Sequence, residues 1–87
     1  MVMYQGEIRN LGISVANIVE STFTITEAKY AIVDSNKNVL LNGDATIDSH
    51  NIYTLFSADN VGQYTLVFIY KIGVETLKAK IFIDVEN

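Results

Sequence analysis

Two short polar segments of this 87-residue chain hold the residues whose types and spacing could do chemistry. The first, Asp34–Asn38 (DSNKN), has oxygen-bearing side chains at alternate positions, as the start of a calcium-binding loop does. The later positions break the pattern. Val39 stands at the sixth position, where glycine is needed, and Ala45 at the twelfth, where a bidentate glutamate should stand. We therefore interpret the segment as a solvated hairpin turn, which these residue types favour.

The second segment, Asp48–Asn51, contains His50, the only histidine of the chain. A Ser-His-Asp triad would need this imidazole, and Ser49 and Asp48 are its neighbours in sequence. Adjacent residues point apart, however, and the sequence has no nucleophile elbow, so we interpret His50 as a turn residue. The five glycines are dispersed and form no phosphate-binding loop. We expect no enzymatic activity, no metal site and no cofactor.

The charge and composition exclude several classes of partner. Ten acidic and six basic residues give a net charge of −4, and the only local basic cluster, Lys71–Lys80, is followed closely by Asp84 and Glu86. Nucleic-acid binding needs a basic patch, so we expect none. Without cysteine the chain has neither disulfides nor thiolate metal sites. With no signal peptide and no apolar run near the about 20 residues of a membrane span, we expect a virion or cytoplasmic protein that does not enter a membrane.

Alternation of side chains with a period of two dominates the chain. It is clearest over residues 28–33, 64–71 and 77–85, where β-branched and aromatic residues predominate. This period is typical of strands, and no long stretch has a sustained helical period. The chain length predicts one domain, residues 1–87. Strands are predicted at about residues 4–9, 12–18, 21–33 (with a bend near Thr26–Glu27), 38–41, 44–48, 51–56, 63–71 and 75–86.

Turn signals separate these predicted strands. Asn42 and Gly43 form the strongest of them, because a type I′ hairpin turn needs positive φ at both central residues. Gly73 lies between two strongly alternating stretches and predicts another hairpin. Short strands with turns at about every 8–12 residues are typical of a β-sandwich or barrel.

The segment Ala58–Tyr64 carries a family resemblance. An acidic residue, a glycine and a tyrosine at the start of a late strand resemble the tyrosine corner of immunoglobulin-like sandwiches. The resemblance implies that the Tyr64 hydroxyl bonds to the backbone near Asp59 and that Gly62 gives the turn its conformational freedom. The cysteine pair and core tryptophan of antibody domains are absent.

The corner, the polar hairpin after Tyr30–Val33, the Asn-Gly turn and the long last strand together are similar to one class of modules. These are the immunoglobulin-like domains of bacteriophage virion proteins and bacterial surface proteins, and the similarity covers about residues 22–86. It implies an all-β fold, an immunoglobulin-like antiparallel β-sandwich of about seven to eight strands, and a structural or adhesive role. Because fold does not fix function, the role rests on analogy.

One face of the predicted sandwich is unusually apolar. If Tyr64 points into the core, Thr65, Val67 and Ile69 of the same strand point outward. In an immunoglobulin-like fold, this strand and the strands predicted to contain residues 28–33 and 75–86 are neighbours in one sheet. The outer face of that sheet then carries five apolar residues, which we call the outer patch: Ala31, Val33, Val67, Ile69 and Phe82. A contiguous exposed apolar patch marks an interaction surface. Alternatively, residues 1–18 fold over this face, or the side chains are merely scattered.

The sequence therefore leaves two functions open. In the first, the chain is a phage-type virion component whose partner is protein, either another copy of itself or a neighbouring structural subunit. In the second, it is a bacterial surface domain that binds a glycan, for which Tyr4 and Tyr53 could stack on sugar rings. Assembly into a defined oligomer would favour the first, and a monomer that binds glycans would favour the second.

Overall fold

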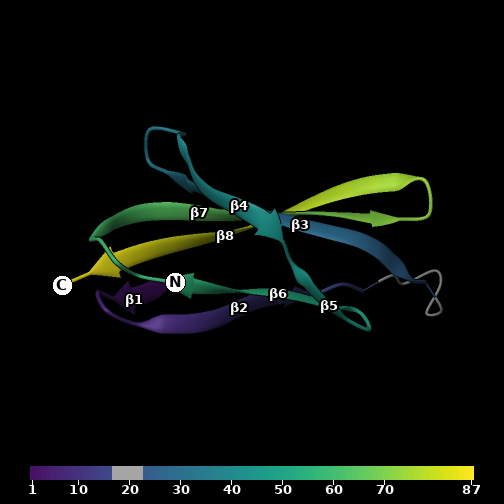
Figure 1. The fold of residues 1–87 in the computed structure, drawn as a ribbon, viewed down its shortest axis with the longest axis horizontal. Coiled ribbons are helices and arrows are strands. Elements are labelled where there is room, and N and C mark those ends of the chain that lie inside the picture. Colours follow the sequence, from purple (N-terminus) through teal and green to yellow (C-terminus); the bar gives the residue numbers. More distant parts are fainter. Residues whose placement is uncertain (17–22) are drawn as a thin grey trace.

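The computed structural model describes residues 1–16 and 23–87, which fold into eight strands in two sheets (Figure 1). The strands are β1 (Val2–Tyr4), β2 (Ile8–Ser14), β3 (Ile25–Asp34), β4 (Val39–Asp44), β5 (Thr46–Asp48), β6 (Asn51–Ser57), β7 (Gly62–Ile72) and β8 (Glu75–Glu86). Sheet A has the order β1-β8-β7-β3-β4, and sheet B has the order β2-β6-β5. The prediction of an all-β fold with about seven to eight strands is confirmed.

The β7–β8 hairpin is the longest element of sheet A. Its two strands pair antiparallel from Gly62 opposite Val85 to Ile72 opposite Glu75. The sequence predicts both strands to within one residue at each end, because their alternation is unbroken. β7 also pairs with β3 from Ile25 to Asp34, so the three strands predicted to be neighbours are neighbours.

The core lies between the two sheets, and its members come from both. Ile52 and Phe56 of β6 face sheet A, while alternate residues of β7 and β8 face sheet B. The largest side chains with essentially no exposed surface are Phe68, Met3, Ile52, Leu66, Ile83 and Val85. Burial at every second position of β7 and β8 follows from the pleat of a strand, which turns successive side chains to opposite faces.

The start of the chain differs from the prediction of one strand over residues 4–9. Val2–Tyr4 pairs parallel with the end of β8 in sheet A, whereas Ile8–Ser14 pairs antiparallel with β6 in sheet B. Gly6 has a φ of 97°, which lets the chain turn between the two sheets. The expectation of a purely antiparallel sandwich is therefore wrong at β1, and sheet A is mixed.

The predicted hairpin turn at Asn42–Gly43 is also wrong. Both residues lie inside β4, opposite Ala31 and Tyr30 of β3, and the chain leaves sheet A only at Ala45. A Cβ at position 43 would lie 3.2 Å from Cε1 of Tyr30, so the glycine leaves room for the ring of its cross-strand partner. The dipeptide is a local signal, and here the pairing with β3 overrides it.

Two predicted strands extend into residues that lie outside the described ranges. β2 ends at Ser14, so the strand predicted over 12–18 is wrong at Val15 and Ala16, and its residues 17–18 lie outside the described ranges. β3 begins at Ile25, so the strand predicted over 21–33 is wrong at Phe23 and Thr24, and its residues 21–22 lie outside the described ranges. Where the sequence predicts a bend, near Thr26–Glu27, the pairing of β3 with β7 shifts register between Ile25 and Glu27, and an irregularity of this kind bends its strand.

Candidate interaction surface

The polar segment after β3 forms a turn that Asp34 caps. Its Oδ1 atom accepts hydrogen bonds from the backbone N–H groups of Asn36 and Asn38, each at 2.9 Å. The carbonyl of Asp34 also accepts the N–H of Lys37, whose φ is 66°. The carboxylate thus satisfies backbone donors within its own turn. Nowhere in residues 1–16 and 23–87 do three His, Cys, Asp or Glu side chains gather closely enough to hold a metal ion.

The imidazole of His50 packs against Phe23. The two rings are stacked, with centroids 3.9 Å apart and planes 14° from parallel. Nε2 lies 2.9 Å from the carbonyl oxygen of Phe23. Because a carbonyl can only accept, Nε2 is the protonated nitrogen in this contact. His50 thereby joins the β5–β6 turn to the residues preceding β3, and the contact does not involve Ser49 or Asp48.

Tyr64 makes a hydrogen bond across the turn that precedes β7. Its hydroxyl donates to the carbonyl oxygen of Asn60 at 3.0 Å, so the bond to the backbone near Asp59 is made, at the residue next to it. Gly62 has a φ of 152°, which residues with a side chain rarely adopt. The ring of Tyr64 packs at 5.9 Å from that of Phe56 in sheet B, so the side chain links the two sheets.

The register of sheet A places the five residues of the outer patch on one face. Ala31 lies opposite Val67, Val33 lies opposite Thr65, and Thr65 lies opposite Phe82. Their neighbours in sequence point the other way, since Ile32, Leu66 and Ile83 are buried. Phe82 is 68% exposed, and the other four members, Ala31, Val33, Val67 and Ile69, are partly exposed. Solvent therefore reaches an apolar strip that crosses β3, β7 and β8.

Residues 1–16 do not cover this strip. β1 extends sheet A beside β8, and β2 belongs to sheet B. Met1 lies near Phe82, to whose carbonyl its ammonium group donates at 2.8 Å, and the Phe82 side chain remains exposed. Of the stretch 1–18 that could have folded over the face, residues 1–16 are described and leave it open, and residues 17–18 lie outside the described ranges.

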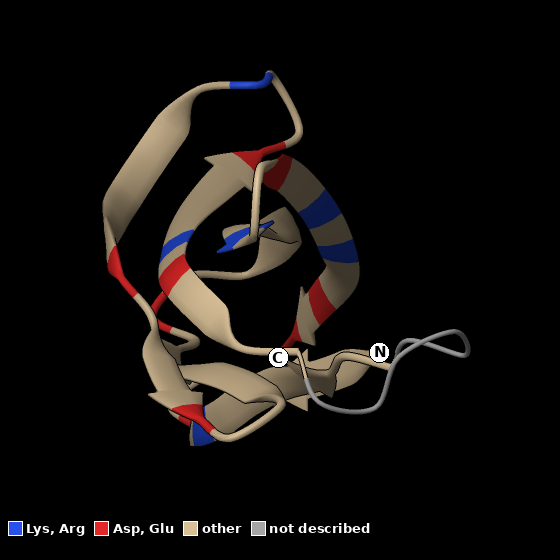
Figure 2. Ribbon diagram, turned by 90° about the vertical axis from the view of Figure 1, so that its right-hand side faces the viewer, with Lys and Arg blue, Asp and Glu red and all other residues tan. Residues whose placement is uncertain are grey.

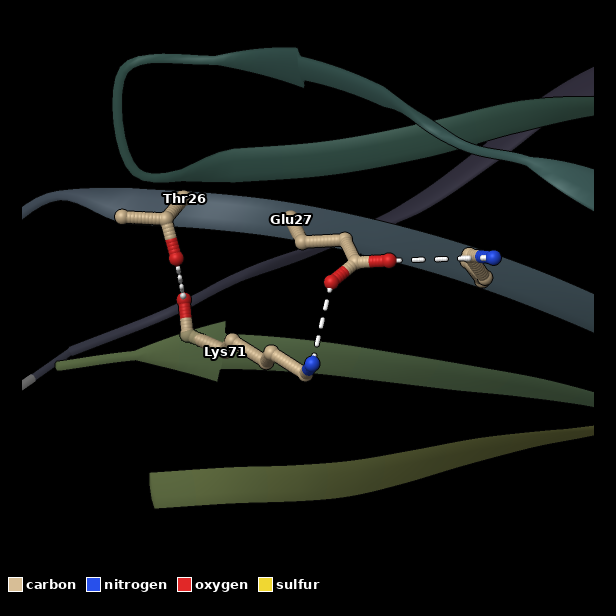
Figure 3. A network of polar contacts seen from close by, with 4 residues as sticks. Thr26, Glu27 and Lys71 are labelled. Carbon is tan, nitrogen blue, oxygen red and sulfur yellow. Dashed lines mark hydrogen bonds and ion pairs between the residues drawn. The ribbon is translucent and has the colours of Figure 1, made fainter. Parts of the chain in front are cut away.

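Charged side chains border the outer patch at the hairpin end of the sheet. Figure 3 shows Glu27 beside Lys71 at the β3 bulge, with the Thr26 hydroxyl bonded to the carbonyl of Lys71. The Glu27 carboxylate lies 3.2 Å from Nζ of Lys71 and 3.7 Å from Nζ of Lys29. The hydrogen bond from Lys71 and the charges of both lysines lower the pKa of Glu27 below its ordinary value of 4.5.

The structure also exposes apolar residues that the sequence analysis did not single out. Val39, Leu40 and Leu41 of β4 are exposed by 57, 54 and 53%. Leu40 and Leu41 line a groove of about 390 Å³ together with Phe56 and Tyr64. β4 is the last strand of sheet A, so its outer edge has no strand partner among the described residues. In the sequence, the run Val39–Leu41 is apolar without alternation, so at least one of its side chains must face outward, and this was the signal that could have indicated the exposed residues.

Comparisons of this chain with models of protein families, with curated proteins and with solved structures found no match. In the described ranges, no helix has the length and apolar character needed to span a membrane.

Proposed function

We propose that this chain is a non-enzymatic structural and protein-interaction module that contacts its partner through the outer patch. One observation carries the proposal: the register of sheet A aligns apolar side chains of β3, β7 and β8 on a face that solvent reaches. In an antiparallel sheet with one face in solvent, the side chains on that face are ordinarily polar. Covering apolar side chains on that face with a partner removes them from water, which favours association.

We further propose that the sandwich is immunoglobulin-like. In variable-type immunoglobulin domains, strands C′, C, F and G form one sheet, and strands B, E and D belong to the other. The orders β4-β3-β7-β8 and β2-β6-β5 have the same sequence of neighbours. The hydrogen bond from Tyr64 to Asn60, near the start of the next-to-last strand, supports the same assignment. The parallel pair β1–β8 is an addition to the antiparallel strands of that scheme.

Among modules of this kind, we propose a phage-type virion component that assembles with itself or with neighbouring structural subunits. The parts of the resemblance that remain, the polar turn after β3, the tyrosine corner at Tyr64 and the long last strand, support this role. A glycan-binding role draws less support from the geometry, because its two tyrosines lie apart. Tyr4 is 56% exposed on β1 of sheet A, whereas Tyr53 is half-buried on β6 of sheet B. They do not form a joint stacking surface.

Charging the outer patch tests the proposal. Ile69→Lys and Phe82→Glu are each expected to weaken association by about tenfold or more, because an unpaired charge buried in an interface costs roughly 1–3 kcal/mol. Association is measured by sedimentation velocity, for the chain alone and mixed with the proteins encoded beside it. Thermal unfolding followed by circular dichroism checks that the variants fold.

Leu55→Glu is the matched control. Leu55 is 65% exposed and faces outward from sheet B, so the change introduces a charge at a similarly exposed apolar site away from the patch. It should leave association unchanged. Folded patch variants that associate as the wild type does would exclude the outer patch as the interface. Variants that no longer fold would mean that these side chains belong to the core.

A further inference from the structure

The outward side chains of β8 have a symmetric order of charge. Its inward side chains alternate with them and pack toward sheet B, with Ile83 and Val85 buried. After Thr76, the outward series, all exposed, is Lys78, Lys80, Phe82, Asp84 and Glu86. Figure 2 shows blue bands followed by red bands along the strand that ends at the C-terminus. Two lysines and two carboxylates thus lie at equal sequence distances on either side of Phe82.

These four charges have no ion-pair partner among the described residues. The ion pairs within residues 1–16 and 23–87 are those of Glu27 with Lys29 and Lys71. Lys78 lies opposite Ile69 and Lys80 opposite Val67, both members of the outer patch. The charges therefore flank the apolar strip and remain free to meet charges of a partner.

We propose that the partner of the outer patch is a second copy of this chain, stacked face to face with its β8 antiparallel to the first. The inference rests on the proposed function, which assigns the outer patch to a protein interface. A two-fold axis passing over Phe82 sets the two Phe82 rings against each other. It also sets Lys80 opposite Asp84 of the partner subunit, and Lys78 opposite Glu86 of the partner subunit.

A single register satisfies all four cross-subunit pairs. Strand residues rise by about 3.3 Å each, so the inner charges lie about 7 Å and the outer charges about 13 Å from Phe82, on both sides. The axis runs along the row of cross-strand partners Val33, Thr65 and Phe82, so the sheets stack strand over strand. Such an interface is isologous. Val33, Thr65 and Phe82 lie along the axis and meet their own counterparts, whereas Val67 lies over Gln63 of the partner subunit.

The opposite orientation is unfavourable. If the two β8 strands stacked parallel, Lys80 would meet Lys80 and Asp84 would meet Asp84 of the other copy. Like charges brought together in an interface disfavour association and select against that arrangement. The order of charges on β8 thus selects antiparallel stacking over parallel stacking of the same apolar strip.

Two charge-reversed variants test this arrangement. K78E/K80E makes the outward charges of β8 all negative, and D84K/E86K makes them all positive. Each variant alone is expected to self-associate at least about tenfold more weakly than the wild type, because every cross-subunit pair becomes repulsive. An equimolar mixture is expected to regain dimers, since one all-negative strand then faces one all-positive strand. Sedimentation velocity measures the stoichiometry, and native mass spectrometry identifies the heterodimer.

R9E/K37E is the control with the same change of net charge. Arg9 lies on β2 of sheet B and Lys37 in the β3–β4 turn, both exposed and away from β8. This variant should dimerise as the wild type does. If it dissociates as K78E/K80E does, the effect comes from net charge, and the proposed pairing is overturned.

The remaining outcomes separate this inference from the proposed function. Folded charge-reversed variants that stay monomeric when mixed would overturn the antiparallel dimer. If Phe82→Glu still abolishes self-association in that case, the outer patch remains an interface with another orientation. A wild type that is monomeric alone but binds a neighbouring subunit through the patch would likewise overturn only the second-copy inference. If association is unchanged in both the Phe82→Glu and the Ile69→Lys variant, the proposed function is overturned as well.

Discussion

Gly12 lies opposite Tyr53 where β2 and β6 pair, at a point where the two backbones leave no room for a side chain. A Cβ at position 12 would lie 2.7 Å from the Cβ of Tyr53 and would also overlap the carbonyl oxygen of Ile52. Gly12→Ala is expected to lower the free energy of unfolding by about 1–3 kcal/mol, because the backbone of sheet B must shift. Urea denaturation measures this change.

Asn10→Ala is the control for this substitution. Asn10 is exposed and points to the same side of β2 as Gly12, so its truncation should change the stability by less than about 0.5 kcal/mol. If Gly12→Ala is equally neutral, sheet B accommodates a Cβ at this position. The overlap with Ile52 and Tyr53 would then have no energetic consequence.

Tyr64 shows which residue-scale features a sequence can reveal. Its hydrogen bond joins residues only four apart, and the glycine between them supplies the required backbone conformation. Such local information can be recognised from one segment. The stacking of His50 on Phe23 brings together residues 27 apart, through a segment whose course depends on both sheets. Nothing in the spacing of the two residues indicates that contact.

At the scale of elements, Glu27 connects the bulge of β3 to β7 through its ion pair with Lys71. Its pKa is lowered chiefly by the hydrogen bond and charge of Lys71. A carboxyl group whose pKa is lower in the folded state stabilises the fold above its unfolded pKa, and loses that contribution as the pH falls through the folded value. Glu27→Gln should therefore destabilise the protein at pH 7, and the difference should disappear in acid below the lowered pKa.

Chemical denaturation of the wild type and the Glu27→Gln variant at both pH values checks this expectation. Because the carboxylate is exposed, added salt should also reduce the difference at pH 7. Glu75→Gln provides a comparison, since Glu75 lies at the tip of the β7–β8 hairpin and forms no ion pair with any described residue. A pH-independent effect of Glu27→Gln would show that the side chain acts through packing rather than charge.

The elements differ in how well the sequence predicts them, for a physical reason. Side chains of β7 and β8 alternate between the two faces along the whole length of each strand. Once Tyr64 is assigned to the core face, the face of each remaining residue of β7 follows. The positions of the outer-patch residues on one face follow from that parity. The pairing of β1 with β8 joins opposite ends of the chain, and a three-residue strand has no period to recognise. The fraction of each outer-patch side chain that solvent reaches likewise depends on the surrounding sheet.

At the scale of the whole molecule, the sandwich is narrow, so the residues that close the ends of its core matter for its stability. The Cα atoms extend over 43 × 21 × 19 Å, so the sandwich is long and narrow. β1 contributes one fully buried side chain, Met3, which lies beside Val85 at the end of sheet A. The same strand covers part of the outer edge of β8, and the residue that follows it, Gln5, continues the contact by donating a backbone hydrogen bond to Glu86. A strand of three residues thus closes one end of the core.

Met3→Ala should reveal how strongly the domain depends on that closure. Truncating a buried methionine costs about 2–5 kcal/mol, through lost apolar burial and the cavity left behind. Domains of this size have only about 5–15 kcal/mol of stability, so the loss is a substantial fraction. Val2→Ala on the same strand removes a side chain that is 48% exposed and should cost far less. Equal effects in urea denaturation would mean that β1 contributes through its backbone pairing with β8 and not through Met3.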